Sequence, residues 1–154
     1  MKDVFHSKTV PLALKIHIFE AACVSILLYG CESWIINQKV RDSLYSFATN
    51  CYRIILGIKR LDKVSNEKVY EMVNRSQLTL QVQQRQLRFV GHSLRRTEND
   101  LINKYVLWAP DVRHGSRGRG KPRTLYHQYI GKLINSETPP IPDEMRNVAS
   151  SGPP

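Results

Sequence analysis

The sequence lacks the patterns of secreted, zinc-binding and membrane-spanning proteins. It has only three cysteines, an odd number, and no CxxC pair. We therefore expect reduced thiols in an intracellular protein of the nucleus or cytoplasm, and no structural zinc site. Charged residues interrupt the N-terminal region, so no secretory signal is predicted. The one continuous apolar run, residues 21–31, lies between two glutamates and is well short of the roughly 20 residues that cross a bilayer.

Catalytic motifs are also missing. The six aspartates stand singly, which excludes the paired carboxylates of two-metal phosphoryl transfer. The five histidines show no metal-ligand spacing, and no GxSxG motif is present. Residues 115–121 fit the spacing GxxxxGK, but Pro122 replaces the Ser or Thr of a P-loop and no buried strand precedes it. We expect no catalytic residue, metal, cofactor or small-molecule substrate.

Positive charge is in excess. The 154 residues carry 23 Lys and Arg against 13 Asp and Glu, a formal net charge of +10, which indicates a polyanionic partner. The backbone of RNA, DNA or both is the first candidate and an anionic membrane surface the second; we predict the first and no membrane. Hydrophobic residues make up 42% of the chain, enough for a folded core. Residues 136–154 reverse the charge and are rich in proline, so we expect a disordered tail.

Apolar residues recur at helical spacing along most of the chain, and no segment alternates with period two. This pattern predicts an all-α fold, a small helical bundle. The first helix follows Pro11, with a buried face of Leu12, Ile16, Phe19, Cys23, Ile26 or Leu27, and Gly30. The second spans about 38–56 and ends at Gly57, with a buried face of Val40, Leu44, Phe47, Cys51, Ile54 and Ile58. Cys51 is thus predicted to be a core residue rather than a functional thiol.

Three further helices are predicted. A short one follows the N-cap Ser65 and buries Val69, Met72 and Val73. The fourth, at about 78–96, has an apolar stripe of Leu80, Leu87, Val90 and Leu94 and should pack on the first two. The last, at about 123–134 with Pro122 in its first turn, buries Leu125, Tyr129, Ile130 and Leu133. We expect three regions: a compact helical domain at 10–108, a basic arm with the last helix at 109–135, and the tail at 136–154.

The fourth predicted helix carries a second stripe, which is cationic. Gln81, Arg85, Arg88, His92 and Arg95 recur at steps of four and three residues, and Arg96 is adjacent. Guanidinium groups bind phosphate bidentately, so such a row suits a nucleic-acid backbone. The alternative is a solvated face, but no acidic residue between Glu71 and Glu98 is present to pair with the stripe. Gly91 in this helix indicates close approach by another helix or by a ligand.

A second basic element precedes the last helix. Residues 113–123 read RHGSRGRGKPR, a glycine-rich and strongly cationic composition. It is typical of a flexible arm that becomes ordered on a polyanion. The nucleic-acid-binding residues predicted in this arm are Arg113, Arg117, Arg119, Lys121 and Arg123.

Four motifs follow one another along the chain: LLYGCESW at 27–34, CYRIILGI at 51–58, RQLRFVGHSLRR at 85–96 and RGKP at 119–122. In this order and spacing they resemble the segment after the polymerase domain of non-LTR retrotransposon reverse transcriptases, over about residues 1–133. The resemblance implies a helical thumb and C-terminal extension, which in that family hold the template and primer duplex. An aromatic residue, usually Trp, follows the last motif in the family, and Tyr126 stands near that place.

The chain departs from that family at the point that matters for catalysis. It contains no two adjacent aspartates, so the polymerase palm motif is absent and we expect no enzyme activity. The predicted function is a non-catalytic nucleic-acid-binding fragment of an RNA-directed DNA polymerase, a truncated or degenerate copy. Two alternatives stay open: a helical protein-interaction module whose first helices contact a polymerase core or a second copy of the chain, and a non-functional reading frame.

Overall fold

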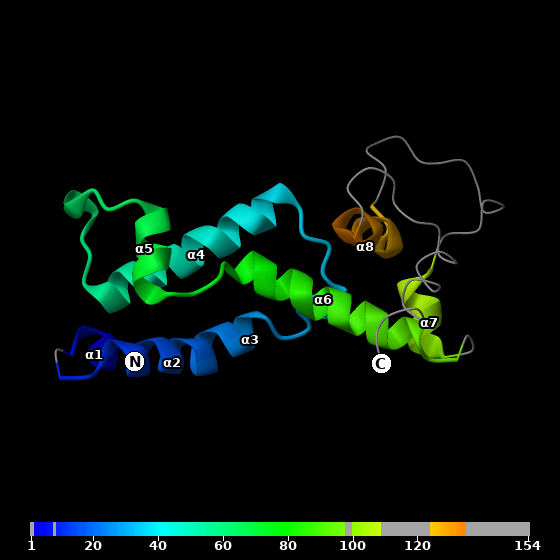
Figure 1. The fold of residues 1–154 in the computed structure, drawn as a ribbon, viewed down its shortest axis with the longest axis horizontal. Helices are drawn as coiled ribbons and strands as arrows, with labels where there is room; N and C mark the ends of the chain where they lie inside the picture. Colours follow the sequence, from blue (N-terminus) through cyan, green and yellow to red (C-terminus); the bar gives the residue numbers. More distant parts are fainter. Residues whose placement is uncertain (1, 8, 98–99, 109–123, 135–154) are drawn as a thin grey trace. The chain divides into compact units, whose positions relative to one another are not determined.

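The computed structural model describes residues 2–7, 9–97, 100–108 and 124–134. These residues form helices and connecting turns without any β-strand, which confirms the predicted all-α fold (Figure 1). The chain divides into two compact units: unit 1 comprises 1–31 and 36–82, and unit 2 comprises 32–35 and 83–154. This division runs through the segment 10–108 that the sequence predicts as one domain. The predicted arm at 113–123 and tail at 136–154 lie outside the described residues.

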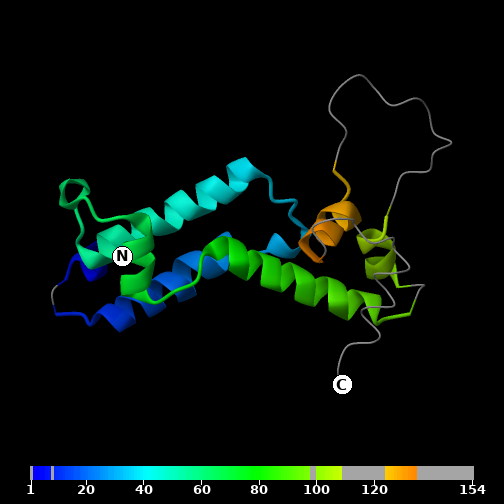
Figure 2. The ribbon, with the colours of Figure 1, turned by 45° about the horizontal axis from the view of Figure 1, so that its top comes forward.

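Unit 1 is built on one long helix and the elements that pack against it. Its helices are α1 (Lys2–His6), α2 (Leu12–Phe19), a π-helical segment (Glu20–Val24), α3 (Ser25–Leu27), α4 (Gln38–Leu56), a 3₁₀ turn (Arg60–Asp62) and α5 (Asn66–Val73). α2, the π-helical segment and α3 form one continuous rod in both views (Figures 1 and 2). α1, α2 and α5 all contact α4.

The buried face of the first helix changes along its length. Ile16 and Phe19 are buried as predicted, while Leu12 is 40% exposed. After the π-helical segment the buried residues are Val24, Leu28 and Cys31 instead of the predicted Cys23, Ile26 or Leu27, and Gly30. A π-helical turn holds an additional residue, so it moves each later side chain one position around the axis. Ile26 is 77% exposed as a result.

Helix α4 has the predicted bounds but a different buried face. Asn37 caps it by accepting from the Val40 N–H at 2.9 Å, and Gly57 ends it with the predicted left-handed φ of 70°. The buried residues are Leu44, Ala48, Thr49, Tyr52 and Ile55. Of the predicted face, Phe47 and Ile54 are 40% and 48% exposed, and Val40, Cys51 and Ile58 are half-buried.

The reason for this rotation is Tyr52. Its ring lies edge-on to Phe19, with centroids 5.4 Å apart, and edge-on to Tyr70, at 5.5 Å. Tyr52 is fully buried between the rod and α5, so the helix turns this large ring inward in place of the smaller Cys51. The stripe 40–44–47–51–54 and the observed stripe 44–48–52–55 both satisfy helical spacing, and ring packing selects the second.

Helix α5 lies across α4 (Figure 1). Its predicted cap is confirmed, because the Ser65 hydroxyl accepts from the Lys68 N–H at 3.2 Å. Val69 and Val73 are buried as predicted, whereas Met72 is 49% exposed. The helix ends at Asn74 in the left-handed conformation, and at the next residue the Arg75 guanidinium pairs with the Glu20 carboxylate.

Unit 2 contains most of α6 (Leu78–Leu94), α7 (Leu101–Val106), α8 (Tyr126–Ile134) and residues 32–35. α6 ends two residues before its predicted end. Val90 and Leu94 are buried as predicted, but Leu80 and Leu87 are 48% and 37% exposed. Val82 and Gln86 are fully buried instead, so the buried face of α6 includes a polar residue.

The other two helices of unit 2 differ from the sequence expectation. α7 was not predicted; the Asp100 carboxylate caps it by accepting from the Ile102 N–H at 2.9 Å. That backbone hydrogen bond, with Arg96 beside it, lowers the pKa of Asp100. α8 begins at Tyr126, about three residues later than predicted, and buries His127, Tyr129 and Ile130. Leu125 and Leu133 are only half-buried.

Candidate nucleic-acid interface

A buried glutamine holds the elements of unit 2 together. The side chain of Gln86 is fully buried in α6, and its Nε2 donates to the Trp34 carbonyl at 2.7 Å. Its Oε1 accepts from the Tyr129 hydroxyl of α8 at 3.0 Å. A second tyrosine of α8, Tyr126, donates to the Glu32 carbonyl. These bonds hold residues 32–35 and α8 against the same stretch of α6. Separating them would leave buried polar atoms without partners, which would lower the free energy of unfolding.

The predicted cationic stripe lies on α6 and lines a surface hollow of about 650 Å³. Arg85, Arg88, His92 and Arg95 are all exposed and all line this hollow. Phe89 of the same helix and Glu32 of residues 32–35 complete the lining. We refer to it as the α6 hollow. The structure therefore places four of the predicted nucleic-acid-binding residues around one space.

Two arginines of the α6 hollow have no protein partner in the part of the chain that the structure describes. Neither Arg88 nor Arg95 makes a hydrogen bond or ion pair there. Arg96 differs: its guanidinium pairs with Asp100 at 3.2 Å and lies 3.3 Å from the His92 Nε2, and it does not line the hollow. Arg88 and Arg95 thus keep their donors for a ligand, whereas Arg96 supports the start of α7.

Other predicted residues fall elsewhere. Gln81, the first position of the stripe, is half-buried and does not line the α6 hollow. The arm residues lie outside the described residues: Arg113, Arg117, Arg119, Lys121 and Arg123. For Gly91, the predicted close approach by another helix is wrong among the described residues, because a Cβ added there would meet no atom within 4 Å, while close approach by a ligand stays a prediction.

Sequence reasoning missed two residues of the α6 hollow. Phe89 lies between the cationic and apolar stripes, and helical spacing assigns it to neither. Glu32 belongs to the LLYGCESW motif, more than 50 residues before the arginines, so no periodic pattern relates it to them. The hydrogen bonds of Gln86 and Tyr126 attach the segment that carries Glu32 to α6 and α8.

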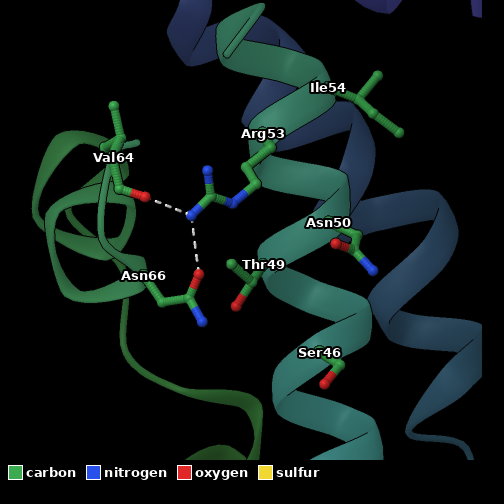
Figure 3. Close-up of a pocket in the computed structure, with 7 residues that line it drawn as sticks. All are labelled: Ser46, Thr49, Asn50, Arg53, Ile54, Val64 and Asn66. Atoms are coloured by element: carbon green, nitrogen blue, oxygen red, sulfur yellow. Dashed lines mark hydrogen bonds between the residues drawn. The ribbon is translucent and has the colours of Figure 1, made fainter. Parts of the chain in front are cut away.

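A second hollow, also about 650 Å³, lies in unit 1 beside α4 (Figure 3). One cationic side chain, Arg53, lines it. Its Nη2 donates to the Val64 carbonyl at 2.6 Å and to Asn66 Oδ1 at 2.9 Å, as the dashed lines in Figure 3 show. This arginine fastens the loop after α4 to the end of that helix, so its main role is structural.

Neither a metal cluster nor a membrane span is found in the described ranges. No group of three or more His, Cys, Asp or Glu side chains is placed to hold a metal ion among those residues. Likewise, none of the helices described is both long and apolar enough to cross a membrane. No family model, no curated protein and no solved structure matches the chain.

Proposed function

We propose that this chain binds nucleic acid through the α6 hollow, as a non-catalytic fragment related to a retroelement RNA-directed DNA polymerase. The observation that carries the proposal is the lining of that hollow by Arg85, Arg88, His92 and Arg95. A planar guanidinium donates to phosphate in bidentate fashion, and each phosphate contact releases condensed counterions. The net charge of +10 adds long-range attraction for a polyanion.

The position of the stripe supports binding without large rearrangement. The same helix is anchored on its opposite side by buried Val90 and Leu94 and by Gln86. The backbone that carries Arg88 and Arg95 is therefore fixed before a ligand arrives, and binding orders only the side chains. The motif order described above supports the link to the thumb of non-LTR reverse transcriptases, and the lack of adjacent aspartates supports a binding role without polymerisation.

A protein-interaction module is the second candidate, and the exposed apolar side chains of unit 1 favour it. Tyr29 and Ile26 are 87% and 77% exposed near the end of the rod. Such side chains suit a polymerase core or a second copy of the chain. Light scattering after size exclusion separates the two candidates: a monomer that binds nucleic acid favours the first, and an oligomer without nucleic-acid affinity favours the second.

The direct test is the double variant Arg88→Gln/Arg95→Gln, measured by fluorescence anisotropy on single-stranded and duplex DNA over a range of salt concentrations. If about six cations contact phosphate, log K of the parent falls against log salt with a slope of roughly −4 to −5. Removal of two contacts makes the slope shallower by about 1.4–1.8 and weakens binding about tenfold or more at low salt.

The matched control is Lys39→Gln/Lys104→Gln, which removes two exposed positive charges, neither of which lines the hollow. It should reduce affinity by a small factor through net charge alone. Circular dichroism checks that both variants retain the helix content of the parent. Equal losses of affinity in the two double variants, or a parent whose affinity is independent of salt, would contradict the proposal.

A further inference from the structure

The α6 hollow contains one residue that a simple phosphate site would not contain. Glu32 lines it together with the arginines, yet its carboxylate makes no ion pair or hydrogen bond with any residue in the described structure. A carboxylate repels phosphate and weakens the field of the cations around it. Glu32 therefore suits a ligand group that carries N–H donors, placed next to the phosphate that the arginines bind.

The position of Glu32 is set by its backbone. The Tyr126 hydroxyl donates to the Glu32 carbonyl, and two residues later Gln86 Nε2 donates to the Trp34 carbonyl at 2.7 Å. Both bonds lie within unit 2. The short segment that carries Glu32 is thus attached to α6 and α8 at two points, and its side chain enters the lining from a fixed backbone.

Phe89 supplies an apolar surface in the same hollow. It is half-buried, so part of its ring is accessible to a ligand. On α6 it follows Arg88 and precedes His92 in the sequence. An aromatic ring beside cations is the usual platform for an unpaired nucleobase, because the base stacks while the cations hold its phosphates. The volume of about 650 Å³ falls within the range of about 300–1,000 Å³ found for small-ligand sites.

We propose that the α6 hollow receives one unpaired guanine nucleotide of a single strand: its base stacks on Phe89, its phosphates contact Arg88 and Arg95, and the Glu32 carboxylate accepts from its Watson–Crick edge. This inference rests on the proposed function and specifies the ligand of the same site. Guanine alone presents two adjacent donors on that edge, N1–H and the 2-amino group, which match the two oxygens of a carboxylate.

The other bases fit the carboxylate less well. Adenine and cytosine present one amino group beside a ring nitrogen that repels Glu32, and thymine or uracil presents one N–H between two carbonyls. In a duplex the Watson–Crick donors of guanine are already paired, so the carboxylate distinguishes single strands from duplexes as well as guanine from other bases. The arginines bind any sequence, and Glu32 adds the selection.

The experiment compares short oligothymidylate strands that carry one central guanine, inosine, adenine or thymine, using the full chain and fluorescence anisotropy. The guanine strand should bind about tenfold more tightly than the thymine or adenine strand, as expected for one bidentate base contact. Inosine lacks the 2-amino group, so the inosine strand should bind about threefold or more weakly than the guanine strand. These comparisons use the parent protein, so they decide the matter without any variant.

Glu32→Gln then assigns the preference to one side chain. The amide presents a donor where the carboxylate presents an acceptor, so the preference for guanine should fall to about twofold or less while the thymine strand binds as well as before or better. The control Glu67→Gln removes an exposed carboxylate from unit 1 and should keep the tenfold preference.

The outcomes separate this inference from the proposed function. Salt-dependent binding of all four strands with equal affinity contradicts the guanine site and leaves nucleic-acid binding intact. A guanine preference that survives in Glu32→Gln also contradicts it, because another group then reads the base. If no strand binds, both proposals fail.

Discussion

Two arginines of unit 1 and two of unit 2 are used differently. In unit 1, Arg53 donates to the Val64 carbonyl at 2.6 Å and to Asn66, and Arg75 pairs with Glu20. The hydrogen bond and charge of Glu20 raise the pKa of Arg75. In unit 2, Arg88 and Arg95 line the α6 hollow without a partner among the described residues. Arg53 and Arg75 thus join segments of unit 1, whereas Arg88 and Arg95 of unit 2 line an open hollow. Arg96, also in unit 2, resembles the first pair because it is bound to Asp100.

This difference shows why net charge alone does not locate a binding surface. A guanidinium that already donates to a carbonyl or carboxylate must break that bond before it contacts phosphate, so its contribution to binding is offset by the loss. An arginine without a protein partner incurs no such loss. Of the 23 Lys and Arg in the chain, Arg88 and Arg95 are therefore expected to contribute most to binding. Four predictions test the difference between the units.

The largest effect is expected at Gln86, which joins α6 to the other elements of unit 2. Gln86→Leu leaves the Trp34 carbonyl and the Tyr129 hydroxyl without their partner and should lower the free energy of unfolding by about 2–4 kcal/mol. Nucleic-acid affinity should fall as well, although no charge changes, because Glu32 and the arginines lose their common support. Denaturant unfolding and anisotropy measure the two effects.

The control for this substitution is Gln84→Leu on the same helix. Gln84 is exposed, so its replacement should change the free energy of unfolding by less than about 0.5 kcal/mol and leave binding as it was. If Gln86→Leu is as stable as the control, the buried hydrogen bonds do not hold unit 2 together. The proposal that the α6 hollow is formed before a ligand binds would then be contradicted.

The same substitution at two glycines should have opposite signs. Gly57 ends α4 in unit 1 with φ of 70°, where a side chain is strained, so Gly57→Ala should destabilise the protein by about 1–2 kcal/mol. Gly91 is inside α6 with nothing within 4 Å of an added Cβ, so Gly91→Ala should stabilise it by about 0.5–1 kcal/mol. Thermal melts measure both. If Gly91→Ala instead destabilised the protein, that result would support the close approach predicted from the sequence.

Tyr52 makes the stability of unit 1 depend on pH in the alkaline range. Burial, and then the nearby charge of Glu20, raise the pKa of Tyr52 from 10.0 to about 12. Below pH 10 the phenol is protonated in both states; between pH 10 and about 12 the unfolded chain releases the proton first, so stability falls as pH rises. Its hydroxyl is buried without a hydrogen-bond partner among those residues.

Tyr52→Phe removes this hydroxyl and keeps the ring that packs on Phe19. The variant should be about 1 kcal/mol more stable than the parent at neutral pH, because an unpaired buried hydroxyl is lost. Its stability should also fall less steeply between pH 10 and about 12. Urea unfolding at several pH values measures both, and parallel curves for the two proteins would contradict the assignment.

Sequence periodicity located the helices better than it located their buried faces. The bounds of α4, the Ser65 cap and the Gly57 end follow from local rules that a few neighbouring residues satisfy. The faces depend on contacts between distant residues, and here a π-helical turn moved one face while the packing of Tyr52 moved another.

The candidate site shows the same limit. Arg85, Arg88, His92 and Arg95 were predicted together because they share one helix face, and they do line one hollow. Glu32 could not be predicted with them, since its place depends on buried hydrogen bonds to Gln86 and Tyr126. No pattern in the sequence marked that glutamine as a core residue.

The smallest effects come from single arginines, and they test the contrast between the units most directly. Arg75→Gln removes an ion pair that is about one-third exposed, with 38% of the Arg75 side chain and 30% of the Glu20 side chain accessible. It should lower the free energy of unfolding by less than about 1 kcal/mol and leave nucleic-acid affinity nearly unchanged. Arg88→Gln should do the reverse. It should change stability by less than about 0.5 kcal/mol, while the salt slope of binding falls by about 0.7–0.9 for one lost phosphate contact. Both variants lose one positive charge, so each controls for the other. If Arg75→Gln reduces the slope as much as Arg88→Gln does, the protein binds through its overall charge, and the α6 hollow is only one part of a diffuse basic surface.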